Sequence, residues 1–257
     1  MGAWYPELYP VFIALMGMTA GSFFNVVIHR VPRMIFQSSC HQYNLFFPRS
    51  HCPECYVSLC WYHNIPVLSW LCLRGKCHSC KTDIAVSYPL TELLFMITAL
   101  LMSYYESNVI EIIFTFFFCG TLLSLALIDL RYTLLPDMLT LPLLWGGLLF
   151  HTLPDESGLM LQDAVFGAVA GYMTLWLLYW IFYALTGREG LGGGDFKLLA
   201  ALGAWSGWKA LPIILLLAAS TGIIMVFAAR VLKNKKFRDE IPFGPSLAFA
   251  GLVCHFF

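Results

Sequence analysis

Eight apolar runs, most of them long enough to cross a bilayer as a helix, limit the folds that this chain can adopt. A transmembrane helix needs roughly 17 to 25 apolar residues. Runs of about this length lie near 10–28, 89–105, 110–130, 138–153, 163–186 and 210–231, and shorter ones at 196–207 and 243–257. Charged residues make up only 12% of the chain, against about a quarter of a soluble domain. We therefore predict an all-α fold: a polytopic membrane helix bundle of about eight spans, in which 196–207 is too short to cross unaided.

The basic residues predict how this bundle is oriented. With the N-terminus outside the cytoplasm, the cytoplasmic loops carry all Lys and Arg residues except Lys209, as expected from the enrichment of such residues in cytoplasmic loops. The outer loops instead carry acids: Glu7, Glu106, Glu111, Asp155, Glu156 and Asp163. No Lys or Arg precedes the first run and no small-residue cleavage site follows it. Residues 1–29 are therefore expected to hold a retained span and not a signal peptide.

Two aspartates lie at the ends of expected spans that face the same side. Asp129, in "LALIDLRYTLLPD", closes the third span, and Asp195, in "GLGGGDFKLLAALGAWSG", opens the sixth. Because the third span runs inward and the sixth outward, we expect both carboxylates at the cytoplasmic face, close together despite their distance in sequence. Two neighbouring carboxylates in a low dielectric share one proton, since both cannot ionise cheaply. This is the acid and base pair that activates water in an aspartic protease.

Three glycines directly precede the second of these aspartates. Gly192, Gly193 and Gly194 free the backbone and remove side chains, so an extended substrate could approach the Asp195 carboxylate closely. The alternative is that Asp195 only caps the N-terminus of a helix, where an acid is favoured. Asp129 lacks this alternative because it ends a helix, where the dipole disfavours an anion.

Three further charged residues near the same face are candidate supporting residues. Asp137 precedes the fourth span, and we expect it to be the N-cap of that helix. Glu92, just inside the second span after "SYPLTE", either complements a helix dipole or takes part in function. Lys197 lies at the edge of the sixth span.

A polar insertion between the first two spans, residues 30–88, carries a metal-binding pattern. "CPEC" supplies Cys52 and Cys55, and "CHSC" supplies Cys77 and Cys80. Two such pairs match a tetrahedral Zn²⁺ site in which each tight turn provides two thiolates. The reducing cytoplasm disfavours disulfides as the other explanation. We predict a small zinc-ribbon-like domain with a structural Zn²⁺ at 30–88, followed by a membrane-embedded core at 89–257.

The remaining candidate ligands are weaker, because four cysteines already complete a zinc site. We expect Cys40, Cys60 and Cys72 to be buried or inert thiols rather than spare ligands. Cys119 and Cys254 lie within spans as small apolar residues. The same reasoning favours no ligand role for His29, His41, His51, His63 and His78. The sequence has no Walker loop, dinucleotide fingerprint or Ser/His/Asp signature, and its formal net charge of zero indicates no nucleic-acid partner.

Six blocks in order carry a resemblance to a known family. They are "GSFFNVVIHRVP" at 21–32, "CPEC" with "RGKCHSC" in the insertion, "SYPLTELL" at 87–94, "IDLRYTLLPDMLTLP" at 128–142, "GGGDFKLLAALGAWSG" at 192–207 and "IPFGPSLAFAG" at 241–251. Across nearly its whole length the chain resembles the bacterial type IV prepilin peptidases, also called prepilin leader peptidase/N-methyltransferases. These are membrane aspartic proteases of the GxGD kind.

The resemblance implies an inner-membrane enzyme with Asp129 and Asp195 as its catalytic pair. Its substrates would be type IV prepilins or the pseudopilins of type II secretion, whose short basic leaders are cut at the cytoplasmic face. Methylation of the new N-terminal amine, with S-adenosylmethionine as donor, would follow. Substrate-binding or supporting roles then fall to Gly192, Gly193, Gly194, Asp137, Glu92 and Lys197.

The segment "IFQSSCHQYNLFF" departs from the family pattern because it contains no Asp or Glu. If an acid there helps methyl transfer in relatives, this chain lacks it. The S-adenosylmethionine site rests on resemblance alone and is expected at "RGK", residues 74–76, and in the first cytoplasmic segment. Two other functions stay open. A proton-coupled transporter would place its acids near the midplane, often in repeated halves. A structural assembly protein of a secretion system would leave the aspartate pair unexplained.

Overall fold

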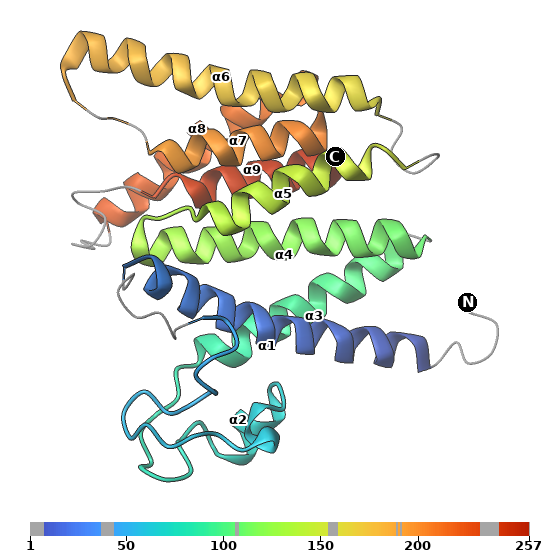
Figure 1. The fold of residues 1–257 in the computed structure, drawn as a ribbon, viewed down its shortest axis with the longest axis vertical. Coiled ribbons are helices and arrows are strands. Elements are labelled where there is room, and N and C mark those ends of the chain that lie inside the picture. The colour runs from blue at the N-terminus through green and yellow to red at the C-terminus, as the bar shows by residue number, and fades with distance from the viewer. Residues whose placement is uncertain are drawn as a thin grey trace. The chain divides into compact units, whose positions relative to one another are not determined.

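The computed structural model describes residues 8–36, 44–105, 108–153, 159–188, 190, 192–231 and 242–256. The chain divides into two compact units, Met1–Phe116 and Phe117–Phe257. In the described residues the only regular elements are helices, apart from two isolated β-bridges. The predicted all-α class is therefore confirmed, and Figure 1 shows the course of the helices.

The first unit pairs two long helices and carries the cysteine insertion between them. Helix α1 spans Leu8–Phe36 and α3 spans Ser87–Tyr105. They approach closely because Gly17 and Gly21 of α1 have no side chains. The space between the helices would not hold one, since a Cβ on Gly21 would lie 2.9 Å from the Glu92 Cα. The insertion contains the short helices η1 (Trp61–Asn64) and α2 (Leu68–Cys72).

Arg30, which lies near the end of α1, anchors the start of the insertion. Its side chain is buried, and its guanidinium donates hydrogen bonds to the carbonyl oxygens of Asn44, at 3.0 Å, and Pro48, at 2.7 Å. A buried guanidinium requires such acceptors to offset the loss of water. The end of α1 and the segment 44–48 are thus held together within the first unit.

The second unit is a bundle built around α7. Helix α4 (Val109–Tyr132) enters it, and the further elements are α5 (Asp137–Phe150), α6 (Leu161–Thr186), α7 (Gly193–Ser206), η2 (Trp208–Ala210), α8 (Leu211–Val231) and α9 (Gly244–Phe256). Residues 198–205 of α7 are all buried. Small residues permit this burial: a Cβ on Gly171 of α6 would lie 2.6 Å from the Leu199 carbonyl oxygen. Small residues at helix crossings are typical of membrane bundles, where packing replaces the hydrophobic effect as the source of association.

A helix occupies each of the eight positions predicted from the apolar runs. Among the described residues, four helices are long and apolar enough to cross a membrane: α1, α4, α6 and the segment Trp208–Val231 that includes α8. Helices α5 and α9 are shorter and apolar. Multiple membrane crossings are therefore supported, whereas the total of eight spans stays a prediction.

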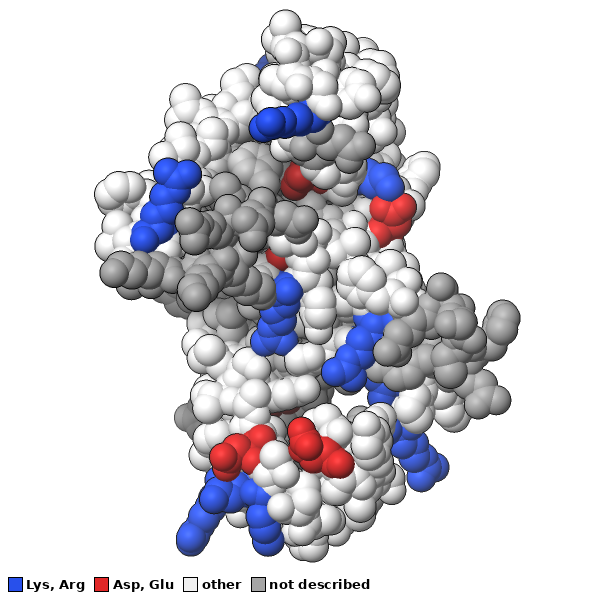
Figure 2. Space-filling model, turned by 90° about the vertical axis from the view of Figure 1, so that its left-hand side faces the viewer, with Lys and Arg blue, Asp and Glu red and all other residues white. Residues whose placement is uncertain are grey.

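The basic residues that the structure describes in the second unit lie mainly at one of its ends. Arg131 is in the last turn of α4, Arg188 follows α6, Lys197 is near the start of α7 and Arg230 is in the last turn of α8. Lys209, in η2, lies beyond the other end of α7. Figure 2 views the end that carries Arg131, Arg188, Lys197 and Arg230, and it shows Lys and Arg side chains spread over that face. Several sequence-predicted residues fall outside the described residues: Glu7, Cys40, His41, Glu106, Asp155, Glu156, Lys233, Lys235, Lys236 and Arg238.

Candidate active site

Asp129 lies in the last turn of α4 with only 5% of its surface exposed. The backbone N–H of Gly244, the first residue of α9, donates a hydrogen bond of 2.8 Å to its Oδ2. The approach depends on glycine, because a Cβ at Gly244 would lie 2.7 Å from the same oxygen. The start of one helix thus supplies a donor to an acid at the end of another, where the helix's own dipole gives no support.

Asp195 lies in the first turn of α7 and is 8% exposed. It interacts electrostatically with Asp129, so the structure brings the two carboxylates into one buried neighbourhood. Its own N–H bonds to the Gly192 carbonyl at 3.1 Å, and Gly192 is the N-cap. The carboxylate also interacts with the Gly192 backbone. The alternative that Asp195 is itself the N-cap is therefore wrong, although it does help to satisfy the helix start.

Leu135 packs against Gly194, which precedes Asp195, and against Gly244, which bonds to Asp129. It belongs to the connection between α4 and α5, and it is nearly fully buried. A Cβ on Gly194 would lie 2.6 Å from the Leu135 Cβ, and one on Gly244 would lie 3.0 Å from its Cδ2. The starts of α7 and α9 therefore close on opposite parts of the same side chain.

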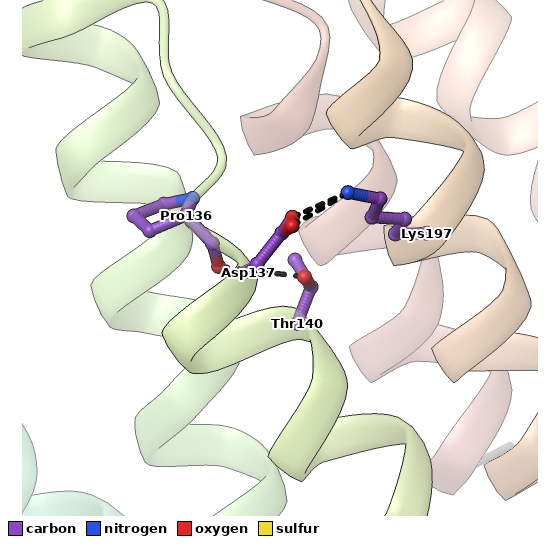
Figure 3. Close-up of polar contacts among 4 residues, drawn as sticks. All are labelled: Pro136, Asp137, Thr140 and Lys197. Atoms are coloured by element: carbon purple, nitrogen blue, oxygen red, sulfur yellow. Dashed lines mark hydrogen bonds and ion pairs between the residues drawn. The ribbon is translucent and has the colours of Figure 1, made fainter. Parts of the chain in front are cut away.

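The structure corrects the expectation that Asp137 is an N-cap. The N-cap of α5 is Pro136, which makes no side-chain capping bond, and Asp137 is the first residue of the helix. The Lys197 Nζ instead donates to both oxygens of Asp137, at 2.6 and 2.7 Å (Figure 3). Residue type alone favoured the cap, but the cation on α7 offers the carboxylate a charged partner that a cap lacks.

Glu92 lies in the first unit, buried in α3. Its Oε2 accepts a hydrogen bond of 2.8 Å from the Val67 N–H in the insertion, and its carboxylate also interacts with the side chains of Ser22 and Asn25 on α1. The carboxylate thus ties the insertion to the α1–α3 pair. The described partners of the Glu92 carboxylate therefore all belong to the first unit.

The four predicted cysteines converge in the first unit. The Sγ atoms of Cys52, Cys55, Cys77 and Cys80 all lie within 4.8 Å of one another. The Cys52–Cys80 and Cys55–Cys77 separations are 3.7 and 4.0 Å, and four sulfurs at the usual distance from one Zn²⁺ are about 3.8 Å apart. The donor set therefore fits a tetrahedral metal ion.

The two cysteine pairs share one backbone design. In each, the first cysteine's N–H bonds to a carbonyl five residues later: Cys52 to Val57 at 3.1 Å and Cys77 to Thr82 at 2.8 Å. The Thr82 hydroxyl, 3.1 Å from the Cys80 sulfur, lowers the pKa of that thiol to about 6. This favours the thiolate, which is the metal-binding form.

The other sulfur and imidazole groups stay outside this cluster. Within the described residues, the cysteine quartet is the only group of three or more His, Cys, Asp or Glu residues close enough to share an ion. Cys60 and Cys72 are exposed, so the expectation that they are buried thiols is wrong, whereas Cys119 is buried as expected. His29 stacks on Tyr88, and the His63 ring lies tilted against that of His78.

Sequence reasoning overlooked Gly244 and Leu135 as parts of the site. Both lie inside blocks already quoted for the resemblance, "IPFGPSLAFAG" and "IDLRYTLLPDMLTLP". A glycine followed by proline at the start of an apolar run was the available signal. It indicates a helix start with free N–H groups, but not which carboxylate they contact.

Comparison with known proteins assigns the family. Residues 15–106 match the Bacterial Peptidase A24 N-terminal domain, and residues 116–227 match the Type IV leader peptidase family. The chain is similar to proteins named prepilin leader peptidase/N-methyltransferase from Aeromonas salmonicida, Dickeya chrysanthemi and Pseudomonas aeruginosa. The identities are 46%, 42% and 40%, over 96%, 97% and 97% of this chain and 90%, 93% and 90% of the relatives.

No solved structure matches the chain. The relatives nevertheless cover it almost from end to end at 40% identity or more. Both family models and the curated relatives agree with the resemblance inferred from the sequence blocks. The chain therefore belongs to the type IV leader peptidase family, a family of membrane proteases.

Proposed function

We propose that this protein is an aspartic endopeptidase that removes the basic leader from type IV prepilins or type II pseudopilins. Asp129 and Asp195 are its catalytic pair. The observation that carries the proposal is the burial of these two carboxylates, which interact electrostatically, at one end of the second unit. The names of the relatives supply the substrate class.

The chemistry needs only the two acids and one water. One carboxylate takes a proton from water while the oxygen attacks the scissile carbonyl carbon, and the other acid donates its proton to the carbonyl oxygen. When the tetrahedral intermediate collapses, the C–N bond breaks, the leaving nitrogen takes the proton that the first carboxylate accepted from water, and the hydroxyl proton returns to the second carboxylate. Since Asp129 and Asp195 interact, one of them is expected to keep a proton while the other is charged.

The site faces the cytoplasm in this proposal. The basic residues Arg131, Arg188 and Arg230 lie at the dyad end of the second unit, and basic residues mark the cytoplasmic side of membrane proteins. The N-terminus then lies in the periplasm. A substrate could keep its apolar helix in the lipid while its leader reaches the dyad from the aqueous side.

The cysteine quartet holds a structural Zn²⁺ in this proposal. Its four thiolates are a soft donor set of tetrahedral shape. The ion would stabilise the folded insertion, which has little apolar core of its own.

Methylation of the new N-terminus is the second proposed activity. It is carried by the relatives' names and uses S-adenosylmethionine as the methyl donor. The region expected for that donor, residues 74–76, forms a turn in which Gly75 packs on Trp70.

The test is cleavage of a purified pilin precursor by the detergent-purified protein. Mass spectrometry of the product N-terminus reports both leader removal and the mass of an added methyl group. We expect Asp129→Asn and Asp195→Asn each to lower kcat/KM about 10²- to 10⁴-fold or more, since each removes one acid–base partner. Asp163→Asn, the same change at the opposite end of the unit, is the matched control.

Two results would overturn the proposal. One is a folded Asp195→Asn protein that cuts at the wild-type rate. The other is a wild-type protein that never shortens the precursor, which is the behaviour expected of a transporter or an assembly protein.

A further inference from the structure

We propose that Asp137 and Lys197 form a positioning ion pair, which holds the first turns of α7 against the start of α5 and so sets the Asp195 carboxylate beside Asp129. This inference rests on the proposed peptidase function. It assigns a task to two residues that do not themselves touch the reacting atoms.

The geometry of the pair is tighter than that of an incidental surface contact. The Lys197 Nζ contacts both Asp137 oxygens, at 2.6 and 2.7 Å, and 34% and 56% of the two side chains is exposed (Figure 3). Lys76 and Asp83, in the insertion, approach only to 4.0 Å with 56% and 88% of their side chains exposed. Exposed ion pairs of that kind contribute little. The Lys197 ammonium, by contrast, lies within hydrogen-bond distance of both Asp137 oxygens, and charge-assisted bonds this short are stronger than neutral ones.

The start of α7 needs such a restraint because its N-cap and its first two residues are glycines, which have no side chains. It begins with glycines after a glycine N-cap, and a Cβ added at Gly193 would meet no atom within 4 Å. Gly192 makes no side-chain capping bond. Glycine backbone is conformationally permissive, so the ion pair adds a restraint to the contacts of Gly194 with Leu135 and of Phe196 with Tyr179.

Helix α5 is a fixed reference for this turn because it is also bonded to the far end of α7. The Trp205 Nε1 donates to the Leu143 carbonyl at 2.8 Å, and a Cβ on Gly147 would lie 2.7 Å from the Trp205 ring. The two contacts join residues separated by 60 and 62 positions. The helices therefore run in parallel and are tied at both ends.

Lys197 acts from the side of α7 away from the dyad. An α-helix turns by about 100° per residue, so side chains two positions apart point in nearly opposite directions. Asp195 interacts with Asp129, whereas Lys197 reaches Asp137. The pair therefore transmits position through one turn of backbone and makes no direct contact with the acids.

The experiment is a double-mutant cycle on the full-length protein, with pilin precursor as substrate. Lys197→Met, Asp137→Asn and the double variant are compared with Lys197→Arg, which keeps the pair, and with Arg188→Met, which removes an exposed cation from the same end. We expect each single variant to lose about tenfold or more in kcat, with little change in KM, because small misplacements of reacting groups are costly. The double variant should be no worse than either single, since both break one contact.

The pH profile separates positioning from charge. Lys197→Met removes a positive charge and Asp137→Asn a negative one. A purely electrostatic effect on Asp129 and Asp195 would therefore shift the whole kcat/KM profile in one direction along the pH axis for Lys197→Met and in the other direction for Asp137→Asn. If both variants instead let the carboxylates drift apart, their coupling weakens, and both variants should bring the two limbs closer together. A loss of folded protein would lower the profile without moving its limbs.

The proposal fails if the single variants keep the wild-type kcat, if their losses add in the double variant, or if Lys197→Met and Asp137→Asn shift the whole profile in opposite directions along the pH axis. Should Lys197→Met not fold, Asp137→Asn, which preserves size and shape, decides alone through its kcat and pH profile. Asp195→Asn in the same series separates the two hypotheses. If it is inactive while Asp137→Asn is normal, the peptidase assignment stands and the ion-pair proposal is refuted.

Discussion

Replacing Gly194 by alanine tests how tightly the candidate dyad is packed. The new Cβ would lie 2.6 Å from the Leu135 Cβ and 3.3 Å from its carbonyl oxygen. Carbon atoms prefer about 3.5 to 4.0 Å, so one partner must move by about 1 Å. Leu135 cannot easily yield, because it is buried and already lies against the start of α9 at Gly244.

The first turn of α7 must therefore shift, and it carries Asp195. A displacement of about 1 Å at a reacting group lowers activity by about 100-fold, which corresponds to about 2.7 kcal/mol of transition-state stabilisation. The matched control is Gly193→Ala, whose Cβ meets no atom within 4 Å. There the replacement is expected to be neutral or slightly stabilising, because alanine restricts the unfolded chain.

Both variants are assayed by kcat/KM for pilin precursor cleavage in detergent, with thermal unfolding recorded in parallel. We expect a large loss for Gly194→Ala, with enough folded protein remaining to measure it, and wild-type activity for Gly193→Ala. If the two variants cleave within about twofold of each other, a range too small for a 1 Å displacement, the packing argument around Leu135 is wrong.

Two further predictions concern the metal cluster and the core of the bundle. Cys55→Ser should reduce the zinc measured by elemental analysis from about one ion per chain to much less, because a tetrahedral site needs all four thiolates, whereas Cys60→Ser should keep the ion; equal zinc in both variants would contradict the cluster. Trp205→Phe should lower the unfolding midpoint by an amount equivalent to about 1 kcal/mol, since it strips the Leu143 carbonyl of its donor within the bundle. Trp208→Phe, at an exposed indole, should change the midpoint less, and the reverse order would refute this reasoning.

The metal prediction also separates the two units. If the dyad works without a metal, a chelator that strips the cysteine cluster should loosen the first unit but leave peptide cleavage by the aspartates intact. Cleavage that stops at once on chelation and returns only with zinc would instead place the ion in the reaction.

The sequence alone predicted the features that depend on short stretches of the chain and on the order of the helices. Apolar runs predicted helices at all eight positions, since each run can satisfy its backbone groups only within itself. The spacing of Cys52, Cys55, Cys77 and Cys80 predicted their convergence, because two tight turns with such pairs have one compact way to meet. Topology also predicted that Asp129 and Asp195 lie at the same end, which their interaction confirms.

Contacts between helices distant in sequence emerged only from the folded chain. Asp137 appeared as an N-cap from its neighbours, yet a lysine 60 positions away takes its carboxylate. Nothing around Asp129 indicates that Gly244, 115 positions later, donates its N–H. The periodicity of apolar residues depends on neighbours along one helix, and so the sequence alone determines it. Which side chains meet across the bundle depends on how closely glycine-lined helices approach, and that is decided only when all of them pack together.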